Sequence, residues 1–133
     1  MPVHHRGMSF VLLVDDTRTF RDGRKHSRAR TSAEALAALG RVRDYGHGQL
    51  WLDHDLGIVD GAVDSTPPVL DESTLPVLDE LARAASDGDP YPFDLVVVHT
   101  SNPVGAATIM QVLERWGYAS RRVPSADELV DET

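Results

Sequence analysis

The pattern of apolar and polar positions along the chain predicts alternating strands and helices. A continuous apolar run, "FVLLVDD" at 10–16, is typical of a strand buried on both faces, and it stops at two aspartates. Two similar runs, "QLWLD" at 49–53 and "DLVVVHT" at 94–100, predict two further buried strands. "YASRRV" at 118–123 predicts a weaker edge strand, and "RKHSRAR" at 24–30 lies where a strand should precede the first helix.

Three segments between these strands have the spacing of amphipathic helices. The first, over 31–42, begins with a capping-box pattern formed by Thr31 and Glu34, and its apolar residues recur on one face. A second helix is predicted over 73–85. A third begins after Asn102, a natural N-cap, and has proline at its first helical position.

Alternation of buried strands with amphipathic helices indicates a parallel α/β sheet. Five strands in this order fit a single flavodoxin-like, three-layer domain over 1–133 with strand order 2-1-3-4-5. The segment 17–23 is irregular, so we expect the first helix of this arrangement to be missing or shortened. The acidic segment 58–72 is expected to be a long loop, and the ends, 1–8 and 127–133, to be loosely ordered.

Composition limits the possible functions. The chain has 133 residues, the size of one domain, and a net charge of −8 with a pI near 5.0. This acidity argues against bulk coating of nucleic acid, but not against an enzyme acting on a nucleotide or an RNA end. The absence of cysteine excludes a disulfide framework, a thiolate zinc site and a cysteine nucleophile. With no apolar run near the ~20 residues of a membrane span and no signal-peptide core, we expect a cytoplasmic protein without a membrane partner.

Polar residues stand at the predicted carboxyl ends of three neighbouring strands. They are Asp15 and Asp16 after the first strand, Asp53, His54 and Asp55 after the third, and His99, Thr100, Ser101 and Asn102 after the fourth. In an open parallel sheet of this order, ligands bind beyond these ends, between the first and third strands. Crowded carboxylates are tolerable when a hard cation such as Mg²⁺ lies among them. The sequence therefore predicts a functional site at this edge.

Each of these residues also has an ordinary structural explanation. Aspartate at a strand end is a common turn residue, a lone histidine is more often structural, and Asn102 is sufficiently explained as a helix cap. Arg18 is compatible with a solvated surface position. The coincidence of three polar strand ends favours the functional interpretation. The basic stretch 21–30 either attracts phosphates or an RNA strand, or protects an exposed edge strand by its charge.

The strand ends resemble those of the receiver domain of two-component signalling. In that family the residues matching Asp15, Asp16 and Asp53 hold Mg²⁺, and the strand-three aspartate accepts a phosphoryl group. Receivers also carry a lysine before a proline after the fifth strand. This chain has Val123 at that place, and the preceding Arg122 is expected to point the other way in a strand.

A closer resemblance is to the cyclic-phosphate-processing receiver-like domains, a divergent branch of the same fold. It rests on "DDTR" at 15–18, "LDHDLG" at 52–57 and "HTSNP" at 99–103, and it covers nearly the whole length. Thr100 replaces the serine usual in this family and keeps the hydroxyl group. The resemblance implies hydrolysis of a cyclic phosphate on an RNA end, a nucleotide or an ADP-ribose derivative, as in RNA repair.

If the chain is such a hydrolase, we expect the polar residues at and near the strand ends to have three roles. A divalent cation, Mg²⁺ or Mn²⁺, is expected to be held by Asp15, Asp16, Asp53 and Asp55. His54 and His99 are expected to be acid and base, in an order that the sequence leaves open. The phosphate is expected to meet Arg18, Thr100, Ser101 and Asn102.

Other mechanisms stay open. Asp53 could instead be a catalytic nucleophile that forms an aspartyl phosphate. Two classes without turnover are also compatible with the sequence, namely a phosphoacceptor or degenerate receiver that switches partners, and a binding protein for nucleotides or phosphate ends. The oligomeric state is not predicted.

Overall fold

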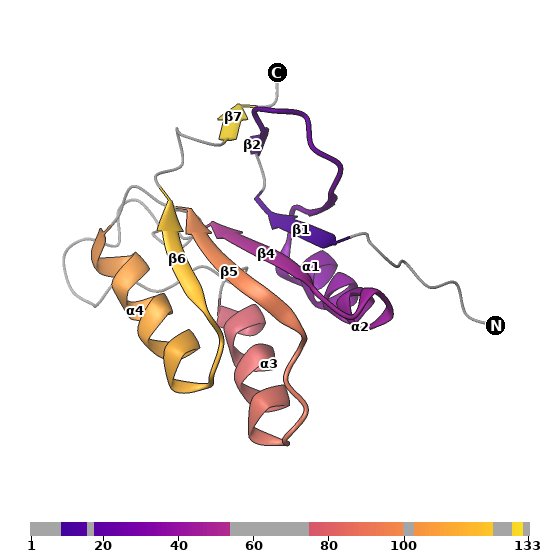
Figure 1. Ribbon diagram of the computed structural model, residues 1–133. Helices are drawn as coiled ribbons and strands as arrows, with labels where there is room; N and C mark the ends of the chain where they lie inside the picture. Colours follow the sequence, from indigo (N-terminus) through magenta and orange to yellow (C-terminus); the bar gives the residue numbers. More distant parts are fainter. Residues whose placement is uncertain (1–8, 16–17, 54–74, 100–102, 124–128, 132–133) are drawn as a thin grey trace.

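The fold is built on a five-stranded parallel sheet with the order β3-β1-β4-β5-β6 (Figure 1). The computed structural model describes residues 9–15, 18–53, 75–99, 103–123 and 129–131. The strands of the sheet are β1 (Phe10–Val14), β3 (Ser27–Ala29), β4 (Gly48–Asp53), β5 (Phe93–His99) and β6 (Ser120–Val123). Because β2 (Arg18–Phe20) lies outside this sheet, the strands of the sheet follow the predicted order 2-1-3-4-5. The flavodoxin-like arrangement is therefore confirmed.

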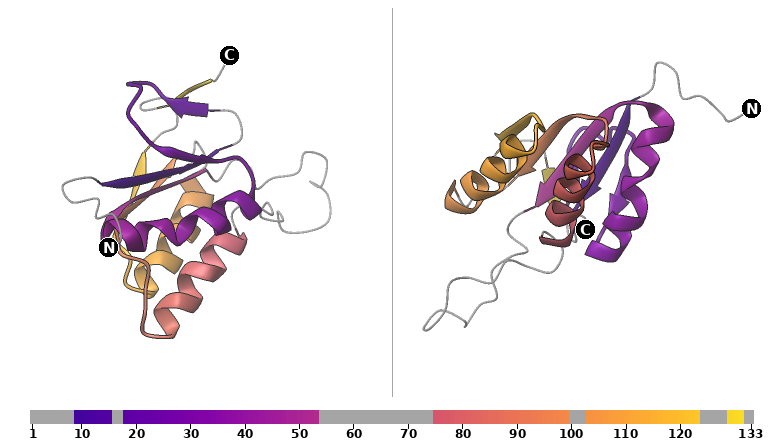
Figure 2. Two further views of the ribbon diagram at one scale, coloured as in Figure 1. Left: turned by 90° about the vertical axis from the view of Figure 1, so that its right-hand side faces the viewer. Right: turned by 90° about the horizontal axis from the view of Figure 1, so that it is seen from below.

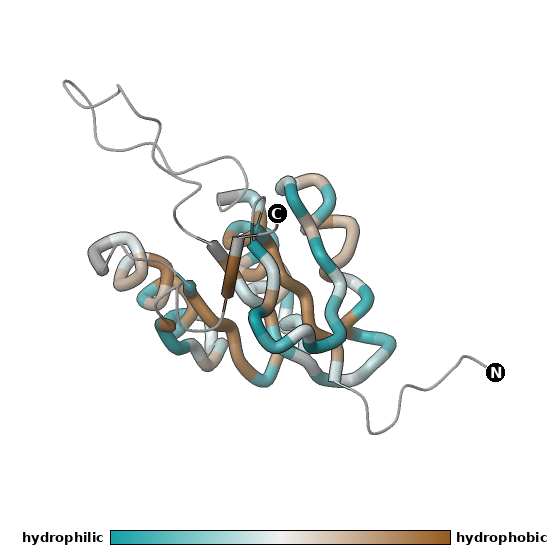
Figure 3. Tube along the Cα trace, turned by 90° about the horizontal axis from the view of Figure 1, so that it is seen from above, coloured by the Kyte–Doolittle hydropathy of each residue, from teal (hydrophilic) through white to brown (hydrophobic). Residues whose placement is uncertain are grey.

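The helices of the described residues cover one face of this sheet (Figure 2). They are α1 (Ser32–Leu39), α2 (Arg41–Tyr45), α3 (Leu75–Ser86) and α4 (Pro103–Arg115). The strand residues Leu12, Leu50 and Val96 are fully buried against helix residues such as Leu39 and Ile109. In Figure 3 the central strands form the longest apolar stretches, as expected for strands covered on both faces. No helix in the described ranges is long and apolar enough to cross a membrane.

The opposite face carries an antiparallel ribbon of two short strands. These strands are β2 (Arg18–Phe20) and β7 (Leu129–Asp131). Phe20 and Leu129 of the ribbon form a second apolar cluster with sheet residues, among them Leu13, Trp51 and Val97. In the described part of the chain, the predicted third layer therefore consists of this ribbon and contains no helix.

The ribbon corrects two expectations from the sequence. The segment 17–23 is not irregular throughout, because β2 lies within it, and the expectation of a loosely ordered end over 127–133 is wrong for 129–131. The physical reason is that a sheet face without helices gains from apolar cover by Phe20 and Leu129. A turn region, with no helix, separates β2 from β3, in agreement with the predicted loss of the first helix. The segments 58–72 and 1–8 lie outside the described residues.

The predicted first helix is divided into α1 and α2 at Gly40. The hydroxyl of Thr31 accepts a hydrogen bond from the Glu34 N–H group at 3.1 Å, as the capping pattern predicts. The Glu34 carboxylate, however, accepts from the Arg30 N–H group at 2.9 Å rather than from the cap residue itself. Gly46 ends α2 with a φ of 84°, a conformation that favours glycine.

The close approach of β1 and β4 makes Gly48→Ala a test of the strand pairing. A Cβ atom at position 48 would overlap the carbonyl oxygen of Phe10, a backbone atom that is fixed by the sheet. We expect a loss of about 2 kcal/mol in the free energy of unfolding, measured with urea. Gly40→Ala is the control, because its Cβ would meet no atom within 4 Å. That variant should gain about 0.5 kcal/mol, so equal losses at both positions would contradict the pairing.

The contribution of the ribbon to the free energy of unfolding can be measured with substitutions in β7 alone. Leu129 is 2% exposed, whereas the neighbouring Val130 is partly exposed. Leu129→Ala should therefore lower the free energy of unfolding by about 2 kcal/mol, and Val130→Ala by less than half of that. Similar small losses for both variants in denaturant titrations would show that the ribbon does not pack on the sheet.

Candidate functional site

Three predicted site residues lie in one row at the carboxyl edge of the sheet. The strand register pairs Val14 with Leu52, and Asp53 with His99. Asp15 directly follows Val14 and so continues this row on the next strand. Because adjacent strands are about 4.8 Å apart, the three residues are close neighbours. This row lies at the ends of β1, β4 and β5. The sequence analysis predicted the site between the first and third strands, which are β1 and β4.

Asp15 and His99 form a buried pair within this row. Both side chains are 0% exposed, and Nδ1 of His99 lies 3.8 Å from Oδ2 of Asp15. This separation is within ion-pair range and longer than a hydrogen bond. A carboxylate beside an imidazole orients the ring and stabilises the imidazolium that forms when the ring accepts a proton. The predicted convergence of these two strand ends is therefore confirmed.

The peptide around Asp15 fixes the direction of its carboxylate. Oδ1 accepts a hydrogen bond at 2.9 Å from the N–H group of Arg18, the first residue of β2. The Asp15 N–H group donates to the Ala29 carbonyl oxygen at 3.0 Å, and Nε of Arg28 donates to the Asp15 carbonyl oxygen at 3.3 Å. With Oδ1 held in this way, Oδ2 is the oxygen nearer to His99. Arg18 thus contributes its backbone here, and a role for its guanidinium group stays a prediction.

An aromatic layer connects His99 to the ribbon. The rings of Trp51 and His99 are 6.1 Å apart, and Phe20 meets Trp51 edge to face at 4.9 Å. The guanidinium group of Arg24 lies over both Phe20 and Trp51, at 4.4 and 5.4 Å from the ring centres. Sequence analysis missed this layer, although the alternation of "LWLD" places Trp51 on the same face as Asp53.

The fifth strand of the sheet places an apolar side chain beside the row. Val123 of β6 pairs with His99 and is buried, whereas Arg122 is exposed and alternates to the other face. The sequence prediction for these two positions is therefore confirmed. The position that holds a lysine in signalling receivers provides no cation here.

Six of the predicted site residues lie outside the described part of the chain: Asp16, His54, Asp55, Thr100, Ser101 and Asn102. Asp53 is placed by its backbone. The described residues contain no group of three acidic or histidine side chains that could hold a metal ion. Asp15, directly after β1, and Asp53, the last residue of β4, are nevertheless carboxylate residues, and carboxylate oxygens are the ligands that Mg²⁺ and Mn²⁺ take. The metal site stays a prediction that this donor chemistry fits.

A second polar cluster lies away from this edge and has a structural role. Glu80 of α3 accepts hydrogen bonds from Arg83 and from the Tyr91 hydroxyl, each at 2.6 Å. These bonds, with the Arg83 bond the larger cause, lower the pKa of the Glu80 carboxyl to about 2. The guanidinium group of Arg43 covers the Tyr91 ring at 4.3 Å. The cluster therefore ties α2, α3 and the segment before β5 together.

The lowered pKa of Glu80 predicts a pH-dependent contribution to stability. An ordinary glutamate has a pKa of about 4.3, so this contribution is complete above about pH 5 and is lost as the pH falls toward 2. Glu80→Gln should lower the free energy of unfolding by about 1 kcal/mol at pH 7, since solvent partly screens the cluster. The deficit should shrink toward pH 2 in urea titrations. Glu114→Gln, at an exposed position on α4, is the control, and a deficit at Glu80 that did not change with pH would refute the assignment.

The comparisons with known proteins bear on most of the chain. The family described as the cyclic-phosphate processing receiver domain matches residues 10–115. This range extends from β1 to the end of α4 and contains every predicted site residue. The search of curated proteins and the search of solved structures found no match.

Proposed function

The chain belongs to the cyclic-phosphate processing receiver domains, and we propose that it is a divalent-metal-dependent hydrolase of cyclic phosphates. The observation that carries this proposal is the buried Asp15–His99 pair, in one row with Asp53. An imidazole supported by a carboxylate is suited to the proton transfers that ester hydrolysis requires. The proposed substrates are cyclic phosphates of RNA ends, nucleotides or ADP-ribose derivatives.

Hydrolysis of a cyclic phosphodiester adds one water molecule across one P–O bond. The water oxygen bonds to phosphorus, one ring P–O bond breaks, and the product is a phosphate monoester with a free hydroxyl group. One proton leaves the attacking water and one reaches the leaving oxygen. In the proposed mechanism His99 carries one of these protons and His54 the other, while Asp15 keeps the His99 ring oriented.

The phosphate group needs compensation for its negative charge. A divalent cation, when bound, would stabilise the charge that develops on the phosphate oxygens. In this proposal the cation is held by the four carboxylates Asp15, Asp16, Asp53 and Asp55. Arg18, Thr100, Ser101 and Asn102 are proposed to bind the phosphate oxygens.

The side chain beside His99 bears on the choice between hydrolysis and a phosphoacceptor role. Signalling receivers have a lysine where this chain has the buried Val123. A stable aspartyl phosphate at Asp53 would therefore lack that ammonium group. This absence supports turnover over a lasting phosphorylated state, while a transient Asp53 adduct is compatible with it.

Phosphorus NMR gives the direct test of turnover. The protein is incubated with 2′,3′-cyclic nucleotides or a cyclic phosphate of ADP-ribose, in Mg²⁺, in Mn²⁺ and in chelator. We expect conversion to a monoester that requires metal and is lost in Asp53→Ala. If every cyclic phosphate stays intact while acetyl phosphate labels Asp53, the protein is a phosphoacceptor and not a hydrolase.

The role of the buried pair predicts the effect of His99→Gln. Loss of a general acid or base should lower kcat/KM for a cyclic nucleotide by about 100-fold or more. His47→Gln is the matched control, because His47 precedes β4 at the other end of the strands and pairs with Asp94 at 3.1 Å. It should keep the original rate. Circular dichroism establishes that both variants are folded, and full activity of folded His99→Gln would remove His99 from the mechanism.

A further inference from the structure

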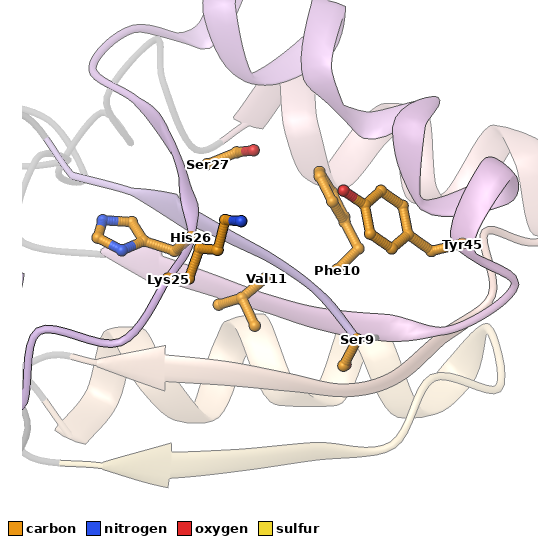
Figure 4. Close-up of a pocket in the computed structure, with 7 residues that line it drawn as sticks. All are labelled: Ser9, Phe10, Val11, Lys25, His26, Ser27 and Tyr45. Carbon is orange, nitrogen blue, oxygen red and sulfur yellow. The ribbon is translucent and has the colours of Figure 1, made fainter. Parts of the chain in front are cut away.

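A pocket of about 410 Å³ lies at the amino end of β1 (Figure 4). Its lining residues come from three parts of the chain: Ser9, Phe10 and Val11; Lys25, His26 and Ser27; and Tyr45. The pairing of β1 with β3 begins at Leu12 and Ser27. The pocket therefore occupies the place where the chain that enters β3 has not yet joined the sheet.

The charge of this pocket is opposite to that of the chain as a whole. Lys25 is the only lysine of a chain whose net charge is −8, and none of the lining residues that the structure describes is acidic. Its side chain is exposed and forms no ion pair within the described residues. Other cations of the same basic stretch are engaged, since Arg24 pairs with Asp22 and Arg28 donates to the Asp15 carbonyl oxygen. The Lys25 ammonium group is thus available to an anion from solution.

Three polar lining residues, Lys25, Ser27 and Tyr45, direct their polar atoms to one side of the pocket. Figure 4 shows the Lys25 nitrogen and the hydroxyl groups of Ser27 and Tyr45 facing the side on which Phe10 lies, while the His26 ring points away. Nδ1 of His26 lies 2.8 Å from the Arg24 carbonyl oxygen, which holds the ring in that direction. An ammonium group with neighbouring hydroxyls is a suitable set of donors for a phosphate.

The same side of the pocket has an apolar wall. The Tyr45 ring is tilted by 41° against Phe10, with the ring centres 5.1 Å apart. Tyr45 remains partly exposed, so its ring is accessible to a ligand. The volume lies within the range of about 300–1,000 Å³ that is typical of small-molecule sites.

We propose that this pocket binds an organic phosphate monoester of nucleotide size. The phosphate meets Lys25 and Ser27, and the organic part lies against Tyr45. The pocket is separate from the Asp15–His99 pair, because Ser27 pairs with Leu12, three residues before Asp15 and about 10 Å away along an extended strand. The inference therefore does not depend on the proposed hydrolase activity.

The single lysine allows binding to be observed at the pocket itself. Reductive methylation with ¹³C-formaldehyde labels Lys25 and the α-amino group, whose NMR signals are told apart by their different pKa values. Dimethylation keeps the positive charge. AMP is expected to move the Lys25 signal and to saturate at about 1 mM, as for a few partly solvated contacts. Inorganic phosphate and adenosine should each bind at least about tenfold more weakly, because each lacks one half of the contacts.

Variants of Lys25 test the role of its charge, with the backbone amide signals of Ser27 and Tyr45 as the readout. Lys25→Met should weaken AMP binding by about tenfold or more, and Lys25→Arg should restore most of it. Arg121→Met, an exposed position on β6 at the far edge of the sheet, should bind AMP like the original protein.

Three results would overturn the proposal. They are an unmoved Lys25 signal with AMP at about 10 mM, equal binding by Lys25→Met and the original protein, and equal affinity for inorganic phosphate and AMP. Because none of these measurements uses turnover, an inactive protein would leave the result interpretable. The proposal of hydrolase activity and the proposal of a phosphate-binding pocket are therefore tested independently.

Discussion

The pairing of β4 with both β1 and β5 is the constraint on which the site depends. β4 contributes Asp53, and its register with the two neighbouring strands puts Asp15 and His99 level with that residue. Side chains along a strand alternate between the two faces, so a shift of one residue would move Asp15 to the helix face, away from His99. The apolar residues that alternate along β1, β4 and β5 resist such a shift, because it would exchange the side chains that pack in the helix cluster with those that pack in the ribbon cluster. The core and the site therefore specify the same register.

The two faces of the sheet differ in how much of their structure can be read from the sequence. The helix face has three segments with helical periodicity and strands with long apolar runs, and these patterns predicted the strand order and the meeting of Asp15 with His99. The ribbon face is formed by strands of three residues. Such segments are too short to show a period, and their partners are more than a hundred positions apart in the chain. The ribbon and the contact of Trp51 with His99 therefore followed only from the tertiary structure.

Local departures from prediction also have physical causes. The apolar spacing of 31–42 continues across Gly40, so periodicity alone gave one helix, while the structure divides it there. The Glu34 carboxylate accepts from the N–H group of Arg30 instead of that of the cap residue. These two N–H groups are adjacent in the chain, and sequence spacing does not distinguish between them. The basic residues of the stretch 21–30 make different contacts in the structure. Arg24 covers aromatic rings, Arg28 donates to the Asp15 carbonyl oxygen, and Lys25 lines a pocket.

The position of Trp51 gives this molecule a built-in optical reporter. Its indole is 1% exposed and contacts Phe20 of the ribbon on one side and His99 of the buried pair on another. The second tryptophan, Trp116, follows α4 and is partly exposed. A shielded and a partly hydrated indole emit at different wavelengths, so the fluorescence of Trp51 is separable from that of Trp116. Any movement of the ribbon or of the His99 ring changes the surroundings of the shielded indole, and the light emitted by the protein then follows events at its buried acid–base pair without a label.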